Sequence, residues 1–141
     1  MSGSNPKVVI VPCSGIGKSH GTISREAAYE VTENLRPDAS RLVALSLLVL
    51  GDEEARSVVA ASPTVTIDGC KLACAATMVR ESGGTVAQEF DVLELCRRHR
   101  ELRPQGISEL NEDGERLARL LAEEVAAAVD AAGGGGGGKD A

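Results

Sequence analysis

The chain has 141 residues, and its 15 basic and 21 acidic side chains give a formal net charge of −6. With Tyr29 and Phe90 as its only aromatic residues, it lacks the stacking rings and the basic face that nucleic-acid binding requires. The longest nearly unbroken apolar run, residues 42–50, is about half the length of a membrane-spanning helix, and Met1–Lys7 is polar, so we expect neither a membrane span nor a signal peptide. The four cysteines are therefore expected in a reducing cytoplasm, where metal binding or thiol chemistry is commoner than structural disulfides.

The first segments have the pattern of a buried strand followed by an amphipathic helix. Residues Lys7–Cys13 are mostly apolar and β-branched without alternation, which is typical of a strand buried on both faces of a parallel sheet. After the loop Ser14–Gly21, apolar residues recur every four positions, at Ile23, Ala27, Val31 and Leu35. This spacing predicts a helix that Thr22 or Ser24 can cap at its start.

The rest of the chain continues to alternate between strands and helices. The uniformly apolar segment 41–50 predicts a second strand, and the segments 64–68 and 85–90 predict a third and a fourth. Acidic starts and glycine or proline breaks delimit helices at residues 52–61, 71–81, 91–101 and 111–131. Residues 108–132 hold seven acids and two arginines, and we interpret the charged side of this last helix as a solvated outer face.

This alternation predicts one small α/β domain. Strands joined through helices form parallel crossovers, so we expect a mostly parallel, four-stranded, doubly wound (Rossmann-like) sheet with helices on both faces. The domain is expected to span residues 1–132. Residues 133–141 are six glycines followed by Lys-Asp-Ala, and we predict a disordered tail there because glycine has no side chain to bury and much entropy to lose.

Three cysteines fall at one edge of this predicted sheet. Ligands of open parallel sheets bind outside the carboxyl ends of the strands, where the strand order reverses. Cys13 closes the first strand and Cys70 follows the third, so their sulfurs converge if these strands are neighbours, as in the common order 2-1-3-4. Cys74 lies about one helical turn after Cys70, at a helix start that favours thiolates. We therefore predict a site built from Cys13, Cys70 and Cys74, whereas Cys96 lies on an apolar helix face and is interpreted as packing.

The motifs around these cysteines carry a family resemblance. The segments Pro12–Lys18, Gly21-Thr22, Thr66–Cys70 and Cys74-Ala75 occur in an order that resembles the DGC family, small proteins named for an Asp-Gly-Cys tripeptide and described as zinc-binding. The resemblance covers roughly residues 7–84. It implies a zinc site built from cysteines, with Cys13, Cys70 and Cys74 as ligands, and no established reaction. Many family members carry another cysteine in the middle segment, whereas residues 41–62 contain none here.

The missing cysteine leaves the fourth ligand open. A structural zinc site takes four ligands in a tetrahedron, and a catalytic site takes three with one position open to water or substrate. His20 can supply a nitrogen, Asp68 a carboxylate, and Cys96 a further thiolate if it turns in from its helix. A thiolate site also suits cuprous copper or an iron–sulfur cluster, so the sequence predicts a soft metal, with zinc favoured by the resemblance.

The loop after the first strand predicts a second kind of site. Gly17-Lys18-Ser19 repeats the end of a Walker nucleotide-binding loop. However, Pro12 stands where that pattern requires its first glycine and has no amide hydrogen to offer a phosphate, so we do not expect ATP or GTP hydrolysis. The loop can still hold a small anion such as phosphate on its backbone amides, at Ser14, Gly15, Gly17, Lys18 and Ser19.

Thiol chemistry is the remaining alternative. In it, Cys13 or Cys70 attacks a disulfide, a persulfide or a metalloid, and Cys74 resolves the product. The Cys-x-x-x-Cys spacing differs from the Cys-x-x-Cys of thioredoxin-like motifs, which weakens the analogy. The sequence leaves open whether the chain is an enzyme, whether it has a protein partner and what its oligomeric state is.

Overall fold

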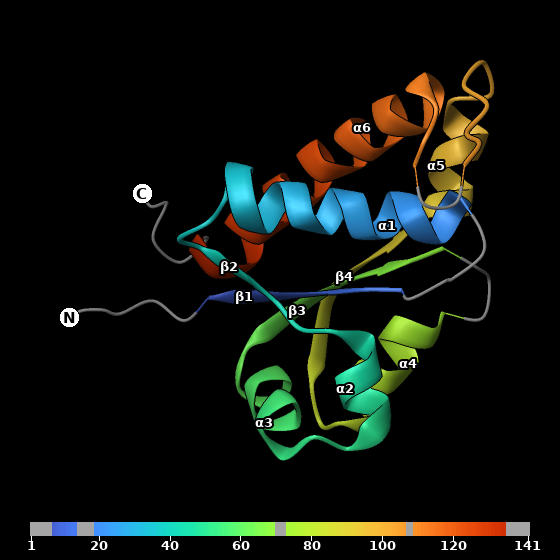
Figure 1. Ribbon diagram of the computed structural model, residues 1–141. Helices are drawn as coiled ribbons and strands as arrows, with labels where there is room; N and C mark the ends of the chain where they lie inside the picture. Colours follow the sequence, from blue (N-terminus) through green and yellow to red (C-terminus); the bar gives the residue numbers. More distant parts are fainter. Residues whose placement is uncertain (1–6, 14–18, 70–72, 107–108, 135–141) are drawn as a thin grey trace.

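The computed structural model describes residues 7–13, 19–69, 73–106 and 109–134. Within them, parallel strands form one four-stranded sheet in the order β2-β1-β3-β4 (Figure 1). The strands are β1 (Val8–Pro12), β2 (Ser40–Leu42), β3 (Pro63–Asp68) and β4 (Thr85–Asp91). The predicted α/β class, the parallel sheet and the strand order are therefore confirmed.

Helices cover both faces of this sheet (Figure 1). One face carries α1 (Ser19–Glu30), α5 (Val92–Arg98) and α6 (Glu112–Val129), and the other carries α2 (Leu45–Leu50), α3 (Glu53–Ala61) and α4 (Cys74–Glu81). Two π-helical segments, η1 (Val31–Leu35) and η2 (Asp130–Gly134), extend α1 and α6. Parallel strands require such crossovers because each connection must return to the same end of the sheet. The result is a small doubly wound, Rossmann-like domain.

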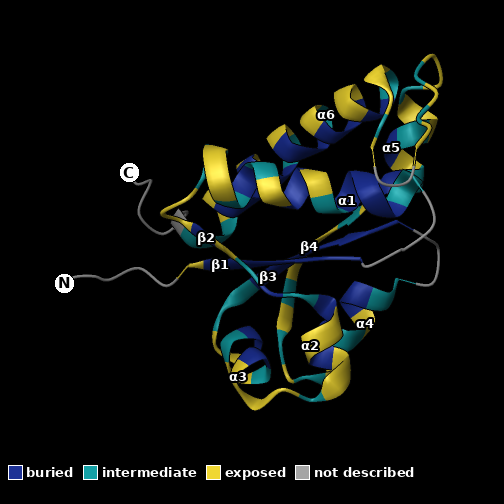
Figure 2. Cartoon of the chain, viewed as in Figure 1, coloured by how far each residue is buried: buried dark blue, intermediate teal, exposed yellow. Residues whose placement is uncertain are grey.

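Strand β1 separates two hydrophobic cores. All five of its residues are buried (Figure 2). Val8 and Ile10 belong to the core under α1, α5 and α6, whereas Val9 and Val11 belong to the core under α2, α3 and α4. Successive side chains of a strand point to opposite faces, so an uninterrupted apolar run fills both cores at once. The prediction of a strand buried on both faces is confirmed.

The predicted second strand is wrong for most of its length. Only Ser40–Leu42 pairs with β1, and Leu45–Leu50 forms helix α2. Leu45 and Leu48, three positions apart, are buried in the core, whereas Leu50 is 80% exposed. A short, uniformly apolar run fits a strand or a helix equally well by periodicity. Here three residues complete the sheet edge, and the following leucines cover the core as a helix.

Two helices begin at residues other than those predicted. α1 begins at Ser19, so Thr22 and Ser24 lie inside the helix and neither is its cap. α4 begins at Cys74, three residues after the predicted start at Lys71. An apolar repeat marks the buried face of a helix and not its first turn, and the first turn of α1 is polar.

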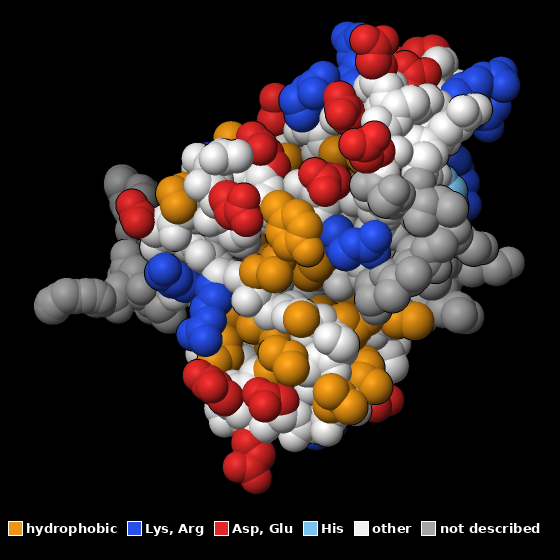
Figure 3. All heavy atoms as spheres, in the orientation of Figure 1, with side chains coloured by type: hydrophobic (Ala, Val, Ile, Leu, Met, Phe, Trp, Pro, Cys, Tyr) orange, Lys and Arg blue, Asp and Glu red, His pale blue; other side chains and the backbone are white. Residues whose placement is uncertain are grey.

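Exposed hydrophobic side chains gather on one part of the face drawn in Figure 3. Charged side chains surround α1 and α6, while hydrophobic side chains gather over α2 and the adjoining part of α1 (Figure 3). The exposed large hydrophobic residues are Tyr29, Leu47, Val49 and Leu50. Helix α6 buries one side, including Leu117, Leu121 and Val125, and exposes its acidic side, as predicted. Among the described residues, no helix has both the length and the apolar character that crossing a membrane requires.

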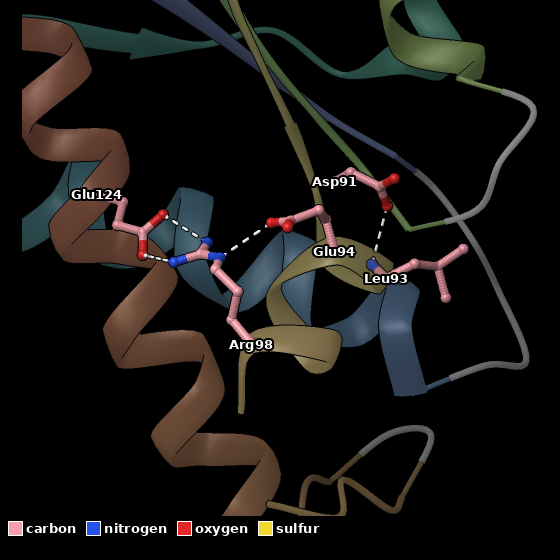
Figure 4. Close-up of polar contacts among 5 residues, drawn as sticks. All are labelled: Asp91, Leu93, Glu94, Arg98 and Glu124. Carbon is pink, nitrogen blue, oxygen red and sulfur yellow. Dashed lines mark hydrogen bonds and ion pairs between the residues drawn. The ribbon is translucent and has the colours of Figure 1, made fainter. Parts of the chain in front are cut away.

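Arg98 joins α5 to α6. Its guanidinium donates to both carboxylate oxygens of Glu124, at 3.0 and 3.1 Å, and to Glu94 at 2.9 Å (Figure 4). Asp91, the last residue of β4, caps α5 by accepting a hydrogen bond of 2.9 Å from the Leu93 amide. Arg97 and Arg98, at the end of α5, are exposed.

The last described turn reaches back to the start of β1. A Cβ atom at Gly133 would lie 2.7 Å from Cγ2 of Val8, so the backbone of this glycine packs closely on the domain. Arg36 donates to both carboxylate oxygens of Asp130 at 2.7 Å, and these hydrogen bonds lower the pKa of Asp130. Residues 135–141 lie outside the described residues, so the tail and the domain boundary at residue 132 stay predictions.

Candidate metal centre

The carboxyl ends of β1 and β3 lie side by side. Pro12 pairs with Ile67, and the Cys13 amide donates to the Ile67 carbonyl oxygen across 2.7 Å. Cys13 itself is buried, with 4% of its surface exposed. Cys13, the first cysteine of the predicted cluster, is therefore held against β3, the strand that leads into the Asp-Gly-Cys segment.

Helix α1 also holds the end of β1. Ser24 is fully buried, and its hydroxyl lies within donating distance of two carbonyl oxygens, that of Gly21 at 2.7 Å and that of Cys13 at 3.2 Å. A hydroxyl buried in this way stabilises the structure only while its partners stay in place. Ser24, which the sequence offered as a helix cap, instead joins the first turns of α1 to Cys13.

Gly69, directly after β3, lies against the start of α1. A Cβ atom at Gly69 would lie 3.0 Å from the carbonyl carbon and oxygen of His20 and 3.1 Å from the Gly21 amide nitrogen. Those contacts are closer than ordinary van der Waals packing, which begins near ~3.5 Å. Glycine therefore lets β3 continue directly beside His20, a half-buried residue in the first turn of α1. Cys70, the next residue, lies outside the described residues.

Asp68 caps helix α4 from the end of β3. Its Oδ1 accepts from the Ala75 amide at 2.8 Å, and its Oδ2 accepts from the Ala76 amide at 3.3 Å. Burial raises the pKa of this carboxyl, the two amide hydrogen bonds oppose the shift, and the negative charges of Glu89 and Asp91 add to it. Asp68 is 4% exposed, so its carboxyl group lies within the protein interior at the foot of α4.

Cys74 is the first residue of α4. It is half-buried and packs against the core under α2, α3 and α4. The preceding residue, Ala73, has a left-handed backbone with φ of 54° and provides no side-chain cap. The predicted helix start at Lys71 is therefore wrong, and the expected approach of Cys70 to Cys74 stays a prediction because Cys70 lies outside the described residues. Local spacing could not predict this start, since the group that fixes it lies six residues earlier in the chain.

Cys96 lies on the other face of the sheet from Cys74. It belongs to α5, on the opposite face of the sheet from α4, and packs against the core under α1, α5 and α6 (Figure 1). Burial raises the pKa of its thiol, and the charge of Asp91 adds to the shift. Its interpretation as a packing residue is confirmed.

The described residues supply only part of the predicted ligand set. Cys13 and Cys74 carry thiols and not disulfides, and His20 and Asp68 come from the same sheet edge or the helix beside it. Sulfur with one nitrogen or oxygen donor is the chemistry that zinc takes in proteins. Among the described residues, no three histidine, cysteine or acidic side chains are grouped closely enough to hold a metal. Of the predicted anion loop, only Ser19 is described, so that site also stays a prediction.

Two pockets of the described part lie elsewhere, between α1 and the start of α6. Their volumes are about 320 and 330 Å³, and both are lined by Glu26, Leu110 and Glu115 without any cysteine.

The four-stranded parallel sheet, the helices on both of its faces, and Cys13 and Cys74 after β1 and at the start of α4 define a small α/β protein. The sequence model of the DGC domain matches residues 9–116, and the chain therefore belongs to the DGC family. The match begins at the second residue of β1, includes the other three strands and ends inside α6. Neither a curated protein nor a solved structure matches the chain.

Proposed function

We propose that this protein binds zinc, or a similar soft metal ion, through Cys13, Cys70 and Cys74 at the carboxyl edge of its sheet. The main support is the hydrogen bond from the Cys13 amide to the carbonyl oxygen of Ile67 in the adjacent strand β3. Ile67 precedes Cys70 by three residues in the sequence. The position of Cys74 at the start of α4 adds to it, since a helix amino terminus stabilises a thiolate. Membership of the DGC family agrees with this choice of donors.

A zinc ion bound here would supply a Lewis acid, with either a closed or an open coordination sphere according to its fourth ligand. His20 is one candidate, because its backbone lies against Gly69 and its ring nitrogen is a common zinc donor. Asp68 is the other, although both of its oxygens already accept hydrogen bonds from α4. The thiolates must stay reduced to bind metal, so the proposal places the protein in a reducing compartment such as the cytoplasm.

The experiment is a measurement of metal content in protein purified without a metal-binding tag. We expect about one zinc per chain in the wild type. Cys74→Ser should lose the zinc, because a neutral hydroxyl replaces an anionic thiolate ligand. Cys96→Ser is the matched control, since it removes a thiol on the other face of the sheet and should leave the metal in place. Full occupancy in Cys70→Ser and in Cys74→Ser would contradict the proposal.

The fourth ligand can be tested with cobalt in place of zinc. The visible spectrum of cobalt responds to its coordination number, and its charge-transfer bands report bound sulfur. If His20 is a ligand, His20→Ala should change the spectrum and admit added imidazole, and cobalt affinity should fall as the pH drops through the histidine range. An unchanged spectrum in His20→Ala would exclude His20.

Thiol chemistry is the second candidate, supported by the thiol state of Cys13 and Cys74. In that case the purified protein should contain no metal, and one thiol should react rapidly near neutral pH because a helix start favours its thiolate. Thiol counting before and after chelation separates the two functions. Chelation unmasks thiols in a metal protein and changes nothing in a redox protein.

A further inference from the structure

Asp68 does for α4 what a local cap does for most helices. The helix start at Ala73 and Cys74 has no side-chain cap of its own. Instead, the carboxylate at the end of β3 accepts from the amides of Ala75 and Ala76, at 2.8 and 3.3 Å, across seven and eight residues of chain. An ordinary N-cap side chain reaches an amide two or three residues on. The bond from Asp68 therefore connects two elements and not one helix to itself.

Cys13 and Cys74, the two described cysteines of the predicted cluster, are thereby both connected to one short part of β3. The Ile67 carbonyl accepts from the Cys13 amide at 2.7 Å. The next residue, Asp68, holds the two amides that follow Cys74. Since Cys13 and Cys74 come from segments far apart in the sequence, these neighbouring anchors fix where one backbone lies relative to the other.

The backbone before Cys74 needs such an anchor. Ala73, with φ of 54°, is the only non-glycine residue of the described part with a positive φ. A side chain with a Cβ adopts this conformation at a cost, which the surrounding structure must offset. The hydrogen bonds from Asp68 act on the first turn immediately after it.

We infer that Asp68 is a positioning residue of the thiolate site, which holds Cys74 in place relative to Cys13 and does not itself bind the metal. This inference rests on the proposed metal binding. Both carboxylate oxygens point to the amides of α4, and only 4% of the residue is exposed. Groups that orient the ligands of a metal typically change its affinity when they are removed, without entering its coordination sphere.

Cobalt titration of four proteins tests this role: the wild type, Asp68→Ala, Asp68→Asn and Asp52→Ala. Asp52 is the matched control because it caps α3, on the same face of the sheet, by accepting from the Ala55 amide at 2.9 Å. We expect Asp68→Ala to bind cobalt roughly 10–100-fold more weakly, with the wild-type spectrum at saturation. Asp68→Asn should lie between the two, because its amide oxygen can still accept one hydrogen bond. Asp52→Ala should bind as the wild type does.

The outcomes separate the inference from the function on which it rests. A wild type that binds no cobalt overturns both. Wild-type affinity in Asp68→Ala overturns the inference alone, and so does a saturated spectrum that differs from the wild type in both Asp68 variants, since that identifies a ligand. An equal loss of cobalt affinity in Asp52→Ala also overturns the inference, because the weaker binding would then follow from lower stability of the whole protein. If circular dichroism shows Asp68→Ala to be unfolded, Asp68→Asn decides between these outcomes.

Discussion

A methyl group at Gly69 should separate the Asp-Gly-Cys segment from the start of α1. The new Cβ would lie 3.0 Å from the carbonyl carbon and oxygen of His20, about half an ångström inside ordinary contact. These are backbone atoms of a helix, so they cannot rotate away as a flexible side chain can. Overpacking of this kind costs about 1–3 kcal/mol, and we expect Gly69→Ala to lower the free energy of unfolding by that amount.

The proposed site adds a second expectation for this variant. Because Gly69 precedes Cys70, a shift that relieves the contact also moves the Asp-Gly-Cys segment relative to His20, and metal affinity should fall. Gly84→Ala is the matched control. Its Cβ would lie 2.5 Å from Cγ1 of Val59, in the core under α3 and α4, so it should destabilise the protein at least as much. Its metal affinity should be unchanged.

Urea unfolding of the metal-free proteins gives the stability difference, and competition with a chromophoric chelator gives the metal affinity. Wild-type stability in Gly69→Ala would show that the two segments separate freely, and the reasoning from this contact would be refuted. Equal losses of affinity in Gly69→Ala and Gly84→Ala would attribute the effect to stability and not to the site.

Three further predictions concern the rest of the fold. Arg98→Ala should lower the free energy of unfolding in urea by no more than about 1 kcal/mol, because the ion pairs of Arg98 with Glu124 and Glu94 are exposed. This loss of stability should be smaller in high salt, and a larger loss that is insensitive to salt would contradict the prediction. Because Arg36 lowers the pKa of Asp130, their pair stabilises the fold above the ordinary aspartate pKa of about 3.9, and this stabilisation is lost as the pH falls through the lower folded value. Urea unfolding across that range should show a weaker pH dependence in Asp130→Asn, and an identical dependence would refute the assignment. Removing residues 135–141 should leave Tm unchanged, and a drop of several degrees would show that the predicted tail docks.

Much of this fold could be predicted because its signals are local. The segment 8–12 is mostly β-branched and has no polar alternation, which is typical of a strand buried on both faces of a parallel sheet. The alternation of strands and helices then limits the connections to parallel crossovers, and the short chain leaves room for few strand orders. The same logic brought Cys13 to the end of β3, which the register of Pro12 with Ile67 bears out.

Contacts between segments that are distant in the sequence determined the features of the fold that local signals could not predict. Residues 45–50 became a helix because the core under α2 accepts Leu45 and Leu48 on one helix face, and nothing within that apolar run distinguishes the two possibilities. The start of α4 depends on a carboxylate that lies outside the helix, whereas capping patterns in a sequence extend over only three or four residues. The need for glycine at position 69 exists only once β3 and α1 lie side by side, because a close approach of two backbones is a property of the packed chain and of neither segment alone.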